Sequence, residues 1–178
     1  MKKTLLGIVG VMMISGLSAS AAFTPPTDEQ LTAAANDPAT LAALLVGASP
    51  EQEAQVVKAV IVQLEALGLP AATQGARVSA VVAAAFADTP AASMSLLAAS
   101  LGTACGASVA ISANPAVVSS VQSAVITAGG ASGAVLARTF GEAYTEAKAA
   151  NQAGNNDALS SAPPQAKGYA GQQQHLPE

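Results

Sequence analysis

Residues 49–67 read SPEQEAQVVKAVIVQLEAL and show most clearly which class of fold to expect. Ser49 stands directly before Pro50 and three residues before Gln52, which is the capping-box pattern of a helix N-terminus. Apolar residues then recur at helical spacing, at Val57, Val60, Ile61, Leu64 and Leu67. The stretch therefore predicts an amphipathic helix whose charged residues lie mostly off the apolar face.

The same start pattern recurs along the chain. A cap-type residue stands directly before a proline in Asp37-Pro38, Ser49-Pro50, Thr89-Pro90 and Asn114-Pro115. Proline is tolerated at the first helical position because its missing N–H would have no partner there. Glycines that can end a helix stand at Gly47, Gly68 and Gly129-Gly130. Since no segment alternates for long with a period of two, we expect an all-α domain.

These boundaries predict an irregular, hairpin-stacked bundle of about six or seven short, Ala-rich helices. The expected helices are 28–35, 38–46, 50–67, 74–87, 90–102, 115–128 and 131–150. Gly, Ala and Ser dominate residues 103–113, which are compatible with a helix or with an irregular crossing. About a quarter of the chain is alanine and only 3% is aromatic, so the core must be built from Ala, Val and Leu at short interhelical distances.

The N-terminus has the pattern of a cleavable secretory signal peptide. Met1-Lys2-Lys3 is a cationic start, and an uncharged apolar run follows over residues 5–17. This run is shorter than the roughly 20 residues that a membrane-spanning helix needs. We therefore expect residues 1–21 to direct export, and the mature protein to be periplasmic or secreted.

Small residues form the expected cleavage site after the apolar run. Ala19 and Ala21 satisfy the A-x-A requirement of the peptidase, so we expect cleavage after Ala21 or Ala22. The helical domain is then predicted over residues 22–150. Asn, Gln, Gly and Pro dominate the remainder, so residues 151–178 are predicted to be a disordered polar tail.

The charge of the mature chain restricts its partners. Lys2 and Lys3 leave with the signal peptide, which leaves five basic residues against 11 acidic ones and a net charge of about −6. This charge disfavours nucleic-acid backbones and anionic lipid, so we expect no nucleic-acid partner. Gly102 and Gly106 have the spacing of closely packed helices, which favours tight packing inside a water-soluble domain. Assembly in a membrane is the less favoured alternative.

Cys105 is the only cysteine, so an internal disulfide is impossible. Its neighbours are small residues, and no His, Lys or Arg lies near it in sequence to lower the pKa of its thiol. The favoured interpretation is a buried small hydrophobic residue. The alternative is a thiol that forms an intermolecular disulfide.

No catalytic, cofactor-binding or metal-binding residue can be assigned from the sequence. The only histidine, His175, lies in the polar tail, where it would lack preorganisation. The close carboxylate pairs Glu51/Glu53 and Glu142/Glu146 fit solvated helix surfaces. Neither a zinc-ligand spacing nor a phosphate-binding loop occurs. We therefore predict a non-enzymatic protein without a cofactor.

Two functions from different classes remain open. The first is a helical interaction module, in the cell envelope or outside the cell, that binds another protein through an Ala- and Val-rich helix face. The second is a structural subunit of the envelope that associates with itself. The oligomeric state and the role of Cys105 distinguish the two.

Overall fold

The computed structural model describes residues 22–87 and 89–160, with the backbone alone described for residues 155–160. The predicted signal peptide at 1–21 and residues 161–178 of the predicted tail lie outside the described residues. Every regular element within the described residues is helical, which confirms the predicted all-α fold class.

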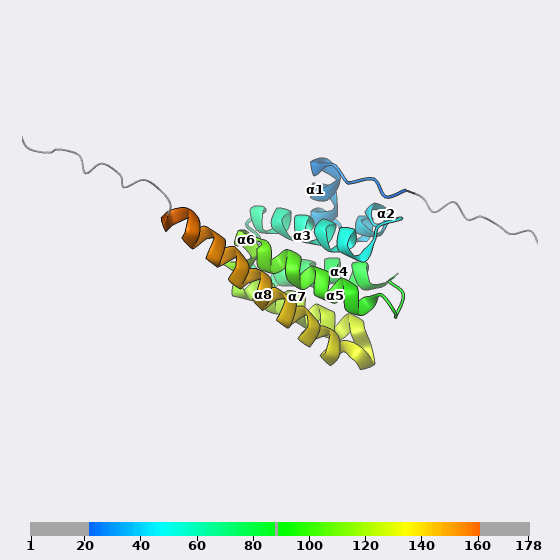
Figure 1. The fold of residues 1–178 in the computed structure, drawn as a ribbon. Coiled ribbons are helices and arrows are strands. Elements are labelled where there is room, and N and C mark those ends of the chain that lie inside the picture. Colours follow the sequence, from blue (N-terminus) through cyan, green and yellow to red (C-terminus); the bar gives the residue numbers. More distant parts are fainter. Residues whose placement is uncertain (1–21, 88, 161–178) are drawn as a thin grey trace, which may run out of the picture.

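The helices follow one another along the chain as Figure 1 shows. The first half contains α1 (Asp28–Asn36), the 3-10 helix η1 (Pro38–Thr40), α2 (Leu41–Leu44), α3 (Pro50–Ala66) and α4 (Ala71–Ala87). The second half contains α5 (Met94–Ala107), α6 (Val109–Ser112), α7 (Pro115–Gly129), the 3-10 helix η2 (Gly130–Ser132) and α8 (Gly133–Ser160).

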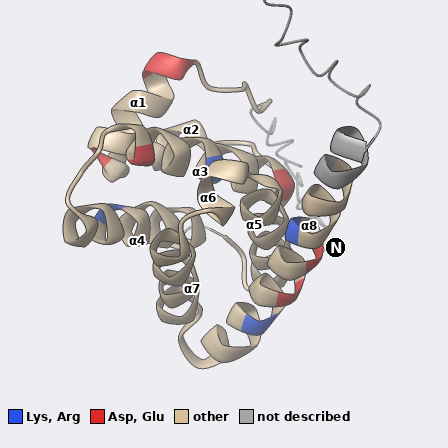
Figure 2. Cartoon of the chain, turned by 90° about the vertical axis from the view of Figure 1, so that its left-hand side faces the viewer, with Lys and Arg blue, Asp and Glu red and all other residues tan. Residues whose placement is uncertain are grey.

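The helices pack in a series that runs from α1 through α3 and α5 to α8. Helices α5 and α8 make the most extensive contact, and α4 packs against α7 beside this series. Figure 2 shows α7 and α8 diverging from the turn that they share. The largest fully buried side chains include Phe86, Phe140, Leu41, Ile61 and Leu64.

Most of the predicted helix starts are made by the expected caps. Ser49 N donates to Gln52 Oε1 at 2.8 Å, and Gln52 N donates to Ser49 Oγ at 3.4 Å. The same reciprocal pair joins Thr27 and Gln30 at the start of α1. The Asn114 side chain caps α7. The capping boxes at Thr27 and Ser49 are therefore confirmed.

The helix start predicted at Thr89-Pro90 is wrong, because α5 begins only at Met94. The Thr89 side chain caps no helix. Its Oγ1 donates instead to Ala85 O at 2.7 Å, the carbonyl one turn earlier in α4. Helix α5 then runs on to Ala107, through part of the stretch in which the sequence left helix and irregular crossing open.

The boundary predicted at Ala150 is also wrong, because α8 continues to Ser160. Asn151 Nδ2 donates to Ala107 O at 3.1 Å and ties this turn of α8 to the end of α5. Extending an existing helix requires no new nucleus, so a polar composition does not stop it. The first prolines after this point are the Pro163-Pro164 pair.

Helices α5 and α8 approach so closely that two positions of α5 require glycine. A Cβ atom added at Gly102 would overlap the carbonyl oxygen of Phe140, and one at Gly106 would overlap that of Tyr144. Both obstructing atoms belong to the backbone of α8, which cannot move aside as a flexible side chain can. The Gly102/Gly106 motif therefore lies in a helix contact inside the domain.

By length and composition alone, the helical stretch Pro115–Gly154 could cross a membrane. Only 33% of its apolar 18-residue window is buried inside the domain. The chain turns at Gly130, whose φ of +51° lies in the left-handed region, and α7 and α8 then contact each other. Core helices of water-soluble domains pass the same test of length and composition, so membrane contact stays the less favoured prediction.

Candidate binding groove

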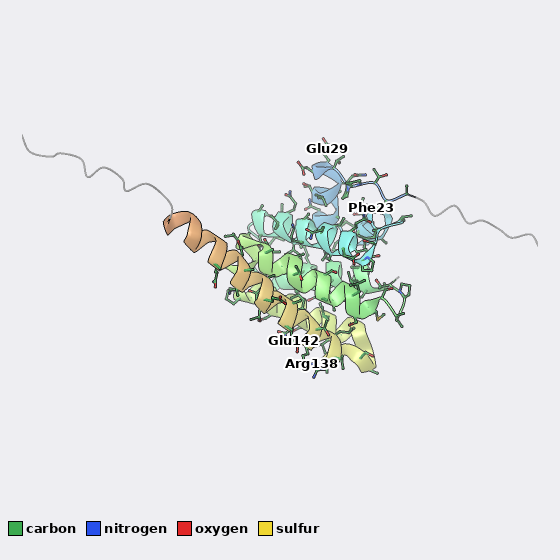
Figure 3. The ribbon with its side chains drawn as sticks, in the orientation of Figure 1. Phe23, Glu29, Arg138 and Glu142 are labelled. Atoms are coloured by element: carbon green, nitrogen blue, oxygen red, sulfur yellow. The ribbon has the colours of Figure 1, made fainter. Side chains whose placement is uncertain are left out.

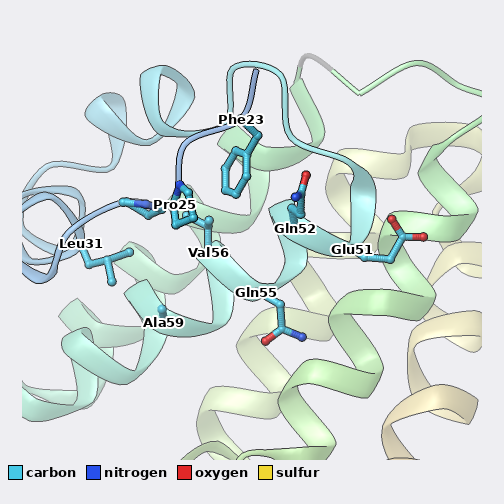
Figure 4. Close-up of a pocket in the computed structure, with 9 residues that line it drawn as sticks. Phe23, Pro25, Leu31, Glu51, Gln52, Gln55, Val56 and Ala59 are labelled. Atoms are coloured by element: carbon cyan, nitrogen blue, oxygen red, sulfur yellow. The ribbon is translucent and has the colours of Figure 1, made fainter. Parts of the chain in front are cut away.

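An apolar groove lies between α3 and the segment that leads into α1 (Figure 4). Its volume is about 360 Å³, within the range of about 300–1,000 Å³ typical of ligand pockets. The residues that line it are Phe23, Pro25, Pro26, Leu31, Glu51, Gln52, Gln55, Val56 and Ala59. The groove is therefore mostly apolar, with its polar side chains contributed by α3.

The N-terminal side of the groove is held in place by a short extended segment. Pro25 and Pro26 fix their own φ angles, and each disfavours helical backbone in the residue before it, which favours an extended chain up to Thr27. Thr27 then caps α1. Phe23 is half-buried and packs against the hydrophobic core. In Figure 4 its ring lies over α3, between Pro25 and Gln52.

The opposite side of the groove is a second apolar face of α3. The first face, which includes Val57 and Ile61, is fully buried in the core. Val56 is only 4% exposed, and Ala59 is half-buried. Both line the groove. Helix α3 therefore packs against the core with one face and against the N-terminal segment with another.

The polar side chains at the edge of the groove differ in their freedom. Gln52 is fixed by the capping box with Ser49. Glu51 Oε2 accepts a hydrogen bond from Ser49 Oγ at 2.8 Å, and this bond holds the pKa of the exposed Glu51 carboxyl below its ordinary value. Gln55 is exposed. The edge of the groove thus presents a charged carboxylate and an amide to a ligand.

A second, smaller cavity of about 250 Å³ lies beside Glu53, between the α2–α3 connection and α4. Burial raises the pKa of the Glu53 carboxyl, although the hydrogen bond from Thr89 Oγ1 at 3.5 Å opposes this shift. Glu51 lines the groove and Glu53 lines this cavity. The two carboxylates therefore face different spaces, and the structure does not bring them together as an acid–base pair.

The residues of the predicted cleavage site lie at the edge of the described chain. Ala19 and Ala21 lie outside the described residues, and Ala22 is exposed. Ala22 directly precedes Phe23, which lines the groove. Cleavage at the predicted site would therefore place the new N-terminus next to the groove.

Cys105 lies fully buried in α5. Burial raises the pKa of its thiol to about 12, so the thiol stays protonated at neutral pH. A protonated thiol without exposed surface is a poor nucleophile for disulfide formation. This position favours the interpretation of Cys105 as a core residue over that of an intermolecular thiol.

The other candidate side chains lie on the outer surface of α8. Arg138 Nε is 3.9 Å from Glu142 Oε1, and both side chains are exposed. Figure 3 shows this pair on a different part of the molecule from Phe23. Among residues 22–87 and 89–160, no group of three His, Cys, Asp or Glu side chains is placed to hold a metal ion.

The groove was not predicted from the sequence, although two features of the sequence pointed to it. Phe23 is one of only three phenylalanines, and it stands directly before the helical domain. Val56 and Ala59 widen the apolar face of α3 beyond a single stripe, which is typical of a helix that packs on two sides. The missing information was which segment covers the second face.

Comparison with protein-family models, curated proteins and solved structures gives no match. Function therefore has to be inferred from the chemistry of the groove itself. Among the described residues, the groove combines the strongest set of features for binding: apolar walls, a half-buried aromatic ring and polar side chains at the edge.

Proposed function

We propose that this protein is an exported, non-enzymatic interaction module that binds another protein through the groove. The cationic start, the apolar run and the Ala19/Ala21 motif support export. The groove supports binding, because its volume of about 360 Å³ and its apolar lining with a few polar side chains are typical of binding pockets.

The observation that carries the proposal is the half-buried Phe23 ring above Val56. A ring that packs with one side only leaves apolar surface for a partner, and aromatic residues dominate the binding energy of protein interfaces. Val56 and Ala59 provide a fixed apolar floor, because a helix with a capping box holds them. A partner side chain that enters here would find a preformed site.

Binding is favoured over catalysis because the acidic groups do not converge. Glu51 is exposed at one cavity, and Glu53 lies in another. General acid–base work requires groups within hydrogen-bonding reach of the same substrate atom. The groove offers the exposed carboxylate of Glu51 and the exposed amide of Gln55, which suit recognition.

Site-specific photo-crosslinking in exporting cells tests the proposal. A photo-crosslinking amino acid in place of Gln55 lies at the edge of the groove, and one in place of Thr145 on α8 is the matched control. We expect a discrete adduct with another protein at the first position only. We also expect Ala59→Arg, which fills the groove, to abolish this adduct.

The same experiment tests the self-associating alternative. An adduct of twice the chain mass at either position, together with an oligomer in light scattering of the processed protein, would favour the structural subunit. The same adducts at both positions, unaffected by Ala59→Arg, would contradict a role for the groove.

A further inference from the structure

Carboxylates border the groove, and no basic side chain lines it. Glu51 lies at one end and Leu31 at the other (Figure 4). Asp28, in the first turn of α1, lies one turn before Leu31 and on the same side of the helix, whereas Glu29 lies on another side. Residues 22–57 contain neither Lys, Arg nor His. The groove therefore has an apolar floor between two anionic ends.

The nearest basic residues do not neutralise these carboxylates. Lys58 is not among the residues that line the groove, and its charge acts on the thiol of Cys105 in α5. Arg77 Nη1 donates to Ala35 O at 3.1 Å, at the far end of α1. Figure 2 shows acidic but no basic residues on α1. Cleavage after Ala21 would add one α-ammonium group beside Phe23. One such cation does not balance the carboxylates of Glu51 and Asp28, so the groove keeps a negative potential for a partner to meet.

We infer that the groove binds an apolar peptide segment that carries lysine or arginine beside its apolar residues. This inference rests on the proposed function and names the partner's chemistry. Aliphatic or aromatic side chains of the segment enter between Phe23 and Val56, and its cations pair with Glu51 and with the first turn of α1. Complementary charge at the rim selects the partner and speeds its association.

A second copy of this chain fits the groove less well than such a segment. The mature chain carries a net charge of about −6, so two copies repel each other. Its cations on α8 are already engaged: Arg138 lies 3.9 Å from Glu142, and Lys148 lies over the Tyr144 ring at 5.7 Å from its centroid. A separate basic partner binds the groove without this charge repulsion and without giving up existing contacts of its cations.

Three synthetic peptides test the inference on the processed protein. They share one stripe of leucines at helical spacing, and their remaining positions are Lys, Gln or Glu. Fluorescence anisotropy measures the affinity of each peptide at low and at physiological ionic strength. We expect the Lys peptide to bind most tightly and the Glu peptide most weakly. The advantage of the Lys peptide should shrink as salt screens the charges.

Matched variants assign the effect to the groove. Glu51→Gln should weaken binding of the Lys peptide by about two- to fivefold, the change expected for one exposed ion pair. It should weaken binding of the Gln peptide less, because that peptide has no cation to lose an ion pair. Glu142→Gln makes the same change of charge on α8, far from the groove, and should leave all three affinities unchanged.

The outcomes separate the inference from the proposed function. Equal binding of all three peptides, abolished by Ala59→Arg, would overturn the inference and leave the interaction module standing. An equal effect of Glu51→Gln and Glu142→Gln would overturn it as well, because net charge alone would then explain the preference. Failure of all three peptides to bind would overturn the inference alone, because a folded partner could still occupy the groove and give the adduct at Gln55.

Discussion

The contact between α5 and α8 and the groove between α3 and the N-terminal segment are opposite ways of covering a helix. At Gly102 and Gly106 the two backbones touch, so that even a methyl group has no room. At Val56 and Ala59 the N-terminal segment does not pack closely against α3, and a space of about 360 Å³ remains between them.

The difference comes from what covers each helix. A regular helix covers α5, and small residues let it approach along its whole face. An extended segment with Pro25 and Pro26 covers the second face of α3, and an extended segment cannot fill the grooves of a helix as another helix can. We expect the first region to determine stability and the second to determine binding.

The largest effect is expected for Gly102→Leu. The new side chain would collide with the Phe140 carbonyl of α8. Helices α5 and α8, which make the most extensive contact in the domain, would then have to separate. We expect a loss of more than about 4 kcal/mol in the free energy of unfolding, or no folding at all. Urea denaturation followed by circular dichroism measures it.

Gly154→Ala is the matched control for this substitution. Gly154 lies in α8 with nothing within 4 Å of an added Cβ atom. Alanine should therefore stabilise the helix by about 0.5–1 kcal/mol. A similar loss of stability in both variants would show that close approach at Gly102 is not the cause.

A smaller effect is expected at Cys105, which lies in α5 one turn after Gly102 and directly before Gly106. Cys105→Ser would bury a hydroxyl group that has no assigned partner, at a cost of about 1–3 kcal/mol. The native thiol, with a pKa raised to about 12, should react with a thiol reagent only as fast as the domain opens. Rapid labelling of the folded protein, or a dimer that reductant dissociates, would instead favour the interpretation of Cys105 as an intermolecular thiol.

The sequence predicted the positions of the helices better than it predicted which segments pack against each helix. Capping boxes at Thr27 and Ser49 are local, so they could be read from spacing alone. The continuation of α8 past Ala150 begins with a contact between Asn151 and Ala107 of α5, which no local pattern reveals. The groove depends on where Phe23 comes to lie, and this is set by tertiary packing.

Phe23→Ala tests whether the groove contributes little to stability. The ring is half-buried, so we expect a loss of about 1 kcal/mol, against about 3–5 kcal/mol for Phe140→Ala at the α5–α8 contact. Partner capture at Gln55 should nevertheless be lost with Phe23→Ala. Comparable destabilisation by both variants would contradict the division between a stabilising region and a binding region.

The smallest effect on stability is expected for Glu53→Gln. Glu51→Gln at the groove is the variant with which it is compared. Burial raises the folded-state pKa of Glu53, so the folded state binds its proton more tightly than the unfolded chain does. Stability contributed by this site is therefore lost as pH rises from the ordinary glutamate value through the raised one. Glutamine carries no charge to desolvate, so at neutral pH it should stabilise the protein by roughly 0.5 kcal/mol or less, since solvent screens the half-buried carboxyl. The gain from glutamine should vanish in acid, where Glu53 is protonated.

At Glu51 the pH dependence has the opposite sign. The hydrogen bond from Ser49 lowers the pKa of the Glu51 carboxyl, so the stability that this group contributes is lost as pH falls. Urea midpoints across this pH range measure both slopes, and slopes of equal sign would contradict the assignment of the two carboxylates to different environments.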